Sequence, residues 1–295
     1  MVNQSLKLII LANGERGLKL ISELIQNNYM ISAVICPCDK YHIFANLKSI
    51  CDVYKEDNVN SLQFTQKIKA LNPDILIVAG FSIILKKEII SIPNIAILNL
   101  HAGALPEYRG GSPLNWQLIN GEEYAGLSVI LLDEGIDTGN ILSEYKIKID
   151  DNENIETLHN KANLIFPKLT LNALEKLKKG DRGVKQNNSF AIYWHQRSDE
   201  DGYINFSSMN SIDIHRIVRA LYPIYPPAWM LYNGKKIRIK KSSCPLIKIK
   251  GIPGKVIFIQ GKGPYIICKD YAILIEDYYL EDSTDFKMKS GMQFV

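Results

Sequence analysis

Residues 7–36 read KLIILANGERGLKLISELIQNNYMISAVIC and set the pattern for the first half of the chain. The segment holds one apolar run at Lys7–Leu11 and another at Ile31–Cys36. Between them, apolar side chains recur at helical spacing across Leu18–Gln26. Short apolar runs bounded by turns predict buried strands, and apolar residues three and four positions apart predict a helix. We therefore expect a strand, a helix and a second strand here.

The same alternation continues along the chain. Apolar runs follow at Asp74–Ala79, Ala96–Leu100 and Ser128–Leu132, and a helical pattern covers Phe64–Leu71. Alternating strands and helices indicate an α/β fold, in which helices cover both faces of a parallel sheet. Right-handed crossovers bring the carboxyl ends of such strands to one edge, where ligands bind. The sequence predicts a Rossmann-like parallel-sheet domain over residues 1–205.

The chain changes character after residue 205. A helical pattern at Ile212–Leu221 is followed by short apolar runs at Met230–Tyr232, Lys236–Lys240, Gly254–Gln260, Tyr265–Cys268 and Ala272–Ile275. The pair Asn233-Gly234 between the first two runs is typical of a two-residue hairpin turn. Five short antiparallel strands predict a smaller β-rich domain of the OB type over residues 206–295.

The composition is that of an ordinary soluble protein. The 295 residues are 46% hydrophobic and 22% charged, and the formal net charge of +4 is too small to indicate nucleic acid. The five cysteines show no zinc-like spacing, so no metal is expected. No apolar run approaches the ~20 residues that span a bilayer, and the first residues carry no cleavage signal. A cytoplasmic location without membrane contact is expected.

The turn after the first strand, residues 12–17, has two interpretations. It contains Gly14 and Gly17, and such a turn at the start of a helix can hold a phosphate on backbone N–H groups. Arg16 could add a contact to a phosphate of the substrate. A dinucleotide fingerprint would begin with glycine, whereas this turn begins with Ala12, so nicotinamide binding is not favoured. The turn could equally serve only to pack the helix on the sheet.

Three polar residues follow two of the predicted strands. Asn99 and His101 lie two apart at the end of one strand, which points both side chains to the same face. Polar side chains emerging from an apolar strand are costly unless something uses them. Asp137 lies in the loop after the next strand, between Gly135 and Gly139. In a parallel sheet both loops open on the ligand edge, so the three side chains are expected to converge.

An amide, an imidazole and a carboxylate together suit acyl transfer to an amine. Asn99 can donate a hydrogen bond to the oxyanion that forms when an amine attacks a formyl carbon. His101 can move protons between the attacking and leaving nitrogens, and Asp137 can orient the imidazole. On the residues alone, a capping amide, a surface histidine and a turn carboxylate remain an alternative interpretation.

Longer motifs surround these residues. They are Asn-x-His at 99–101, Leu-Pro-x-x-Arg-Gly at 105–110 and Asp-x-Gly-x-Asp-Thr-Gly at 133–139. In this order and spacing, the chain resembles the folate-dependent formyltransferases over roughly residues 5–240. The resemblance implies that 10-formyltetrahydrofolate is the formyl donor. It also implies that Asn99, His101 and Asp137 are the catalytic residues.

The same resemblance implies a folate pocket made by two backbone segments. The residues that match them are Ile83, Ile84, Leu85, Asp133, Glu134, Gly135 and Ile136. The first segment is an apolar run just after a strand, which suits a flat ring. A helix start that packs on the core would look the same in sequence, so that alternative stays open.

The acceptor amine is predicted from the resemblance of shorter segments to particular members of the family. Residues 37–47 lack the basic, glycine-containing insert of methionyl-tRNA formyltransferases, whereas residues 108–116 and 197–204 resemble enzymes that formylate nucleotide-linked amino sugars. The favoured acceptor is therefore the amino group of a nucleotide-linked amino sugar, with dTDP as the favoured carrier, in surface polysaccharide biosynthesis. Nucleic acid is not an expected partner. The candidate substrate contacts are Arg16, Arg109, Tyr222 and Trp229.

Two other functions remain open at this point. One is methionyl-tRNA formyltransferase, which shares the length and the two-domain layout. The other is a folate- or nucleotide-binding protein without catalysis, against which the intact trio of Asn99, His101 and Asp137 argues. Assembly as a homodimer is also left open.

Overall fold

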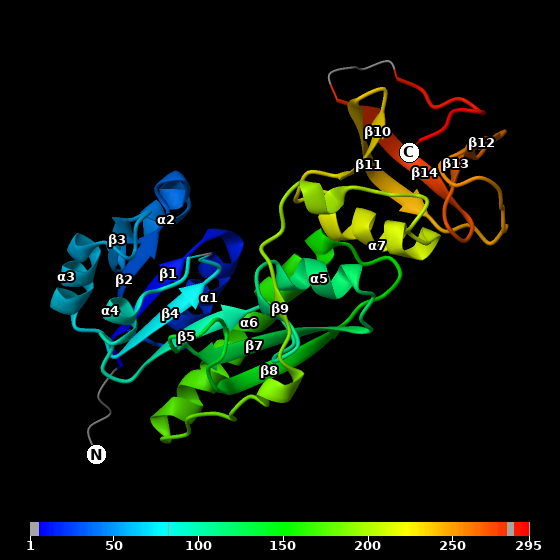
Figure 1. Cartoon of the computed structure of the whole chain (residues 1–295). Helices are drawn as coiled ribbons and strands as arrows, with labels where there is room; N and C mark the ends of the chain where they lie inside the picture. The colour runs from blue at the N-terminus through cyan, green and yellow to red at the C-terminus, as the bar shows by residue number, and fades with distance from the viewer. Residues whose placement is uncertain (1–5, 82, 282–285, 295) are drawn as a thin grey trace. The chain divides into compact units, whose positions relative to one another are not determined.

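The computed structural model describes residues 6–81, 83–281 and 286–294, and Figure 1 shows the course of the chain. Two compact units can be distinguished. The N-terminal unit comprises residues 1–113, 126–147 and 160–194, and the C-terminal unit comprises residues 114–125, 148–159 and 195–295. The division after residue 205 that the sequence suggested stays a prediction.

A seven-stranded sheet forms the centre of the N-terminal unit, with the strand order β3-β2-β1-β4-β5-β7-β8. Its strands are β1 Leu8–Ala12, β2 Ile31–Cys36, β3 Asp52–Lys55, β4 Ile75–Ala79, β5 Ala96–His101, β7 Tyr124–Leu131 and β8 Ile141–Lys148. Strands β1 to β5 pair in parallel, which confirms the mostly parallel α/β sheet. Every residue of β1 and β4 is buried, as strands covered on both faces require.

Helices alternate with the strands along the chain. The α-helices of the chain are α1 Gly14–Gln26, α2 Tyr41–Phe44, α3 Leu62–Leu71, α4 Lys87–Ile90, α5 Pro113–Ile119, α6 Ile155–Lys178 and α7 Ser211–Leu221. Single 3-10 turns lie at Cys38–Lys40, Ala45–Ser49, Asn188–Phe190 and Glu200–Gly202. One core cluster joins Phe64 and Ile68 of α3 to Ile9 of β1 and Leu76 of β4. Within the described ranges, no helix is both long and apolar enough to cross a bilayer.

The direction of β7 corrects one expectation from the sequence. The strand pairs antiparallel to β5, with Asn99 opposite Ile130 and His101 opposite Ser128. The sheet is therefore not parallel throughout, and the argument that the loop after β7 opens on the ligand edge was wrong. An apolar run reveals that a segment is a buried strand, but carries no information on its direction.

The C-terminal unit is built on an antiparallel sheet of five strands in the order β10-β11-β14-β13-β12. They are β10 Ala228–Tyr232, β11 Lys235–Ser243, β12 Val256–Ile259, β13 Gly263–Ile267 and β14 Ala272–Leu280. The hairpin between β10 and β11 turns at Asn233-Gly234, both at positive φ. Helix α7 packs Ile214 and Val218 against Ile237 of β11 and Ile273 of β14. The β-rich C-terminal domain is confirmed.

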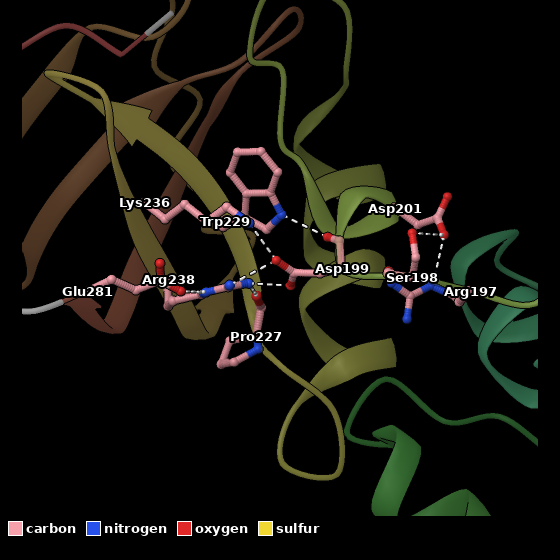
Figure 2. A network of polar contacts seen from close by, with 9 residues as sticks. All are labelled: Arg197, Ser198, Asp199, Asp201, Pro227, Trp229, Lys236, Arg238 and Glu281. Carbon is pink, nitrogen blue, oxygen red and sulfur yellow. Dashed lines mark hydrogen bonds and ion pairs between the residues drawn. The ribbon is translucent and has the colours of Figure 1, made fainter.

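A polar network fixes β11 to the segment before α7 (Figure 2). The buried Arg238 guanidinium donates to both carboxylate oxygens of Asp199, at 2.5 and 2.9 Å, and to Glu281 at 2.5 Å. Lys236 pairs with the same Asp199 carboxylate, and the Trp229 indole donates to the Asp199 carbonyl oxygen at 2.8 Å. The hydrogen bonds from Arg238 are the main cause that lowers the pKa of Asp199 to about 2.

We expect Asp199→Asn to lower the free energy of unfolding at pH 7 by about 1–2 kcal/mol, because Arg238 loses a charged partner. The pKa of the carboxyl is lowered in the folded state, so its contribution is present above the unfolded-state value near 3.8 and is lost as the pH falls toward 2. Urea unfolding of both proteins across this pH range measures the difference, which should shrink with acid.

The matched control is Asp277→Asn. Asp277 is exposed and lies 3.8 Å from Lys240, so its removal should change the free energy of unfolding by less than about 0.5 kcal/mol. A destabilisation by Asp199→Asn that stayed constant down to pH 2 would contradict this explanation of the network.

Candidate active site

The three side chains expected to converge lie together in the N-terminal unit. Asn99 and His101 project from β5, and Asp137 stands in the loop of residues 132–140 between β7 and β8. The Asn99 amide Nδ2 donates to Asp137 Oδ1 at 3.2 Å, and His101 Nδ1 lies 3.5 Å from the same oxygen. The convergence predicted from the sequence is thus present, although a loop beside an antiparallel strand produces it.

The imidazole of His101 is buried and held at both of its nitrogens. Its Nε2 atom lies 2.6 Å from the carbonyl oxygen of Tyr108, so Nε2 carries a proton in this arrangement. Nδ1 then faces the Asp137 carboxylate. A Cβ atom at position 103 would lie 2.6 Å from both Nε2 and the Tyr108 oxygen, so Gly103 leaves the room for this contact. The Nδ1 side of the ring therefore points at Asp137, which Asn99 also contacts.

Asp137 holds its position in a conformation that L-residues rarely adopt. Its φ is +52°, in the left-handed region, which costs about 1–2 kcal/mol for a non-glycine residue. The backbone N–H of Gly110 donates to Asp137 Oδ2 at 2.9 Å, while Asn99 occupies Oδ1. The carboxylate is therefore oriented by donors at both oxygens.

Arg109, a predicted substrate contact, is turned into the protein. Its side chain is 1% exposed, and its guanidinium donates to Gln186 Oε1 at 3.0 and 2.8 Å, to Asn188 Oδ1 at 2.8 Å and to the Tyr193 hydroxyl at 2.9 Å. The backbone beside it, β6 Arg109–Gly110, pairs in parallel with β9 Tyr193–Trp194. The arginine ties this loop to the segment that follows α6.

Gln186 is a residue of the site that the sequence did not reveal. Its amide Nε2 donates to the carbonyl oxygens of Asp137 and Gly139, at 2.8 and 2.7 Å. A single buried glutamine in a polar linker has no spacing or motif that would mark it, so only the three-dimensional arrangement connects it to Asp137.

The two segments expected to bind folate lie next to one another. Lys87, at the start of α4, pairs with Glu134 of the second segment at 2.9 Å. Ile83, Ile84 and Ile136 are 39%, 70% and 47% exposed, while Leu85 is buried in the core. Three isoleucines thus present apolar surface to solvent beside the loop that carries Asp137.

The remaining predicted contacts lie in other surroundings. Arg16 of α1 donates to Asn163 Oδ1 at 3.2 Å, and its guanidinium lies 4.8 Å from the centre of the Phe166 ring, both in α6. Tyr222 follows α7 in the C-terminal unit, and Lys240 lies over its ring. Trp229 of β10 packs against Tyr203, with ring centres 4.8 Å apart. A binding role for Arg16 stays a prediction.

Two family models match the chain. The model of the formyl transferases covers residues 7–174, and the model of the formyl transferase C-terminal domain covers residues 197–293. The chain belongs to the formyl transferase family. The first match includes β5, the Asp137 loop and most of α6, so the whole trio of this formyl transferase falls inside it.

Curated relatives extend the comparison. The methionyl-tRNA formyltransferase of Caldanaerobacter subterraneus subsp. tengcongensis is 30% identical over 292 residues, which are 94% of this formyl transferase and 93% of that protein. The methionyl-tRNA formyltransferase of Thermodesulfovibrio yellowstonii is 36% identical over 203 residues, which span 63% of that protein.

Solved structures share the fold. The N-formyltransferase from Helicobacter canadensis, in complex with folinic acid and dTDP-3-aminofucose, superposes with a TM-score of 0.70 at 21% identity, over 93% of this chain and 99% of that one. HypX from Aquifex aeolicus in complex with tetrahydrofolic acid has a TM-score of 0.65 at 18% identity. This formyl transferase spans 44% of the HypX chain.

These findings overturn the expected acceptor. Relatives with 28–36% identity carry the name methionyl-tRNA formyltransferase. Solved sugar N-formyltransferases, such as the Helicobacter canadensis enzyme, are 17–21% identical, which shows a shared fold alone. The sugar-nucleotide interpretation was wrong. The expectation against a nucleic-acid partner loses its main support with it, and substrate contacts by Arg109, Tyr222 and Trp229 stay predictions.

The structure gives a physical reason for the error. The segment of residues 108–116, read as sugar-specific, is occupied with internal contacts. Tyr108 stacks on Trp194 with 5.6 Å between ring centres, and the Trp116 indole donates to the His195 carbonyl oxygen. Side chains that pack the protein are shared by enzymes with different acceptors, so their identity does not specify the substrate.

Proposed function

We propose that this protein transfers the formyl group of 10-formyltetrahydrofolate to the amine of methionyl-tRNA. The observation that carries the proposal is the similarity to methionyl-tRNA formyltransferases along nearly the whole chain, together with an intact Asn99, His101 and Asp137 cluster. Family membership supports the formyl transfer, and the names of the relatives support the acceptor.

The exposed isoleucines support a folate site beside the trio. A flat pterin ring between residues 83–85 and 133–137 would cover Ile83, Ile84 and Ile136, and removing apolar surface from water is favourable. The first segment is held in place by Asn60, whose amide donates to the Ile84 carbonyl oxygen at 2.9 Å and accepts from the Lys86 N–H at 2.8 Å. The pair of Lys87 and Glu134 supports the same slot from its rim.

In the proposed reaction, the amine nitrogen attacks the formyl carbon and a new C–N bond forms, while the carbonyl electron pair moves to oxygen. Asn99 donates a hydrogen bond to that oxyanion. The intermediate then collapses, the bond from the formyl carbon to N10 of the folate breaks, and N10 keeps the electron pair. The ammonium loses one proton and N10 gains one, so the products are the formylated amine and tetrahydrofolate.

His101 is placed to carry that proton. Its Nε2 proton is engaged by the Tyr108 carbonyl, which leaves Nδ1 as the nitrogen that exchanges protons. Asp137 faces Nδ1 at 3.5 Å and stabilises the ring while it is doubly protonated. Asp137 needs no proton of its own in this scheme, because Gly110 and Asn99 keep donating to its oxygens.

The acceptor part of the proposal predicts a weak dependence of RNA binding on salt. Several cations of β11 are paired internally: Arg238 with Asp199 and Glu281, and Lys241 with Glu276 at 2.7 Å. Charges that are already paired release few counterions when RNA binds, so the slope of log affinity against log salt should be shallow.

Gel-shift titration with initiator methionyl-tRNA, at salt concentrations between about 50 and 200 mM, tests the acceptor. We expect a retarded complex whose affinity falls only slightly across this range. Free methionine should compete poorly, because it lacks the phosphate backbone. Failure to retard the RNA at any of these concentrations would overturn the acceptor and leave the formyl transfer itself in place.

A further inference from the structure

The backbone carbonyl groups of Asp137 and Gly139 share one donor. The Asp137 oxygen and the Gly139 oxygen accept hydrogen bonds from the single Nε2 atom of Gln186, at 2.8 and 2.7 Å. These bonds hold the backbone where it takes the left-handed conformation, with φ of +52° at Asp137. If these two hydrogen bonds were lost, the backbone at Asp137 would be freer to adopt the conformations that an aspartate ordinarily prefers.

Gln186 is itself fixed from the opposite side. Its Oε1 accepts two hydrogen bonds from Arg109, at 3.0 and 2.8 Å, and this double contact determines which end of the amide is the donor end. Both side chains are buried, so water is a poor replacement for either partner. Arg109, Gln186 and the Asp137 loop thus form one continuous chain of hydrogen bonds.

The loop of Arg109 also reaches the Asp137 carboxylate directly. Gly110, the next residue, donates its N–H to Asp137 Oδ2 at 2.9 Å. The backbone of Asp137 is therefore held through Gln186 and its side chain through Gly110, and both depend on where Arg109 lies. Any shift of this assembly moves the carboxylate relative to His101 Nδ1.

We propose that Gln186, held by Arg109, is a positioning residue that keeps Asp137 in register with Asn99 and His101. This inference rests on the proposed function, because it concerns the carboxylate that assists formyl transfer. The hydrogen bonds of Gln186 go to Arg109 and to the backbone of the Asp137 loop, so its effect should fall on turnover and leave binding unchanged.

Gln186→Glu tests this role with little disturbance of Arg109. The new carboxylate still accepts from the guanidinium, but it has no N–H to offer the Asp137 and Gly139 oxygens. We expect kcat for formyl transfer to methionyl-tRNA to fall on the order of 10- to 100-fold, since small misplacements of catalytic groups have effects of this size. The KM values for both substrates should change less than about threefold.

A second variant and a control guard against a general effect on folding. Gln186→Met removes the donors without adding charge and should give a similar loss of kcat. Asn188→Ala removes another acceptor of Arg109 that does not touch Asp137, and it should keep kcat within about threefold of the wild type. Thermal unfolding of all three variants shows which of them keep the fold.

Two readouts separate positioning from a merely structural role. The Gly110 amide proton, which donates to Asp137 Oδ2, should shift in the NMR spectrum of the Gln186 variants and stay in place in Asn188→Ala. In a double variant with Asp137→Asn, the Gln186 substitution should add almost no further loss of kcat, because residues acting through one another are not additive.

The outcomes are distinguishable from failure of the proposed function. Wild-type kcat in a folded Gln186→Glu or Gln186→Met variant, with Asp137→Asn inactive, would overturn the positioning role alone. Full additivity in the double variant would do the same. Wild-type kcat in Asp137→Asn itself would instead overturn the catalytic assignment on which the inference rests.

Discussion

His101→Asn lowers kcat for formyl transfer by roughly 10²-fold or more, the usual scale for loss of a general acid–base group. Asparagine is close to histidine in size and keeps some hydrogen bonding, but it cannot take a proton from the ammonium and deliver it to the folate nitrogen. His101 is buried and its Nδ1 faces Asp137, so the substituted side chain would stand at the same place without a titratable nitrogen. KM for methionyl-tRNA should stay close to the wild-type value, which steady-state kinetics with 10-formyltetrahydrofolate measure.

The control for this variant is His42→Asn. His42 lies on the exposed surface of α2, and its replacement should leave kcat and KM unchanged. A His101→Asn protein with near wild-type kcat would show that another group transfers the proton. Membership of the formyl transferase family would be unaffected by that result.

Asn99→Ala has the second large effect, a loss of about 10²–10³-fold in kcat, which is typical when one oxyanion donor is removed. The amide also donates to Asp137 Oδ1 at 3.2 Å, so its removal leaves that oxygen with His101 as its remaining close partner in the trio. The substrate complex forms before the oxyanion exists, and KM should therefore change little. Steady-state kinetics under the same conditions provide the measurement.

Asn94→Ala is the matched amide deletion. Asn94 is exposed just before β5 and contacts Asp74, away from the trio in the same unit. It should retain wild-type kcat. If Asn99→Ala raised KM by the factor expected for kcat while kcat itself stayed at the wild-type value, Asn99 would be a binding residue. The oxyanion role would then be wrong.

The strands that could be predicted from the sequence are those that are buried along their length and therefore consist of consecutive apolar residues. Strands β1, β2 and β4 are of this kind. Strand β3 has two exposed ends in four residues, and β8 carries three exposed residues in a row, so neither gives such a run. Both were absent from the predicted set for this reason.

The convergence of Asn99, His101 and Asp137 could be predicted from the sequence, but the strand direction that produces it could not. The motifs identify Asn99, His101 and Asp137, whereas the direction of β7 and the left-handed turn at Asp137 depend on the assembled sheet. Arg109 illustrates the same limit. A basic residue beside a glycine resembles an anion site, and only contact with Gln186, 77 positions later, reveals a buried support.

The acceptor was the least predictable feature. Tyr108 and Trp116 matched the pattern of sugar-modifying enzymes because they pack against Trp194 and His195, a requirement of the fold that is independent of the acceptor. Local motifs report chemistry at the reacting atoms more reliably than they report the rest of a large substrate. The proposed acceptor rests instead on similarity along 94% of the chain.

The most direct test of the account is the mass of the amino acid released from methionyl-tRNA after incubation with the protein and 10-formyltetrahydrofolate. The account predicts methionine heavier by one formyl group, formed by the wild type and nearly absent with the His101→Asn, Asn99→Ala double variant. The account would be contradicted if a folded wild-type protein left the methionine of methionyl-tRNA unmodified but transferred the formyl group of 10-formyltetrahydrofolate to another amine.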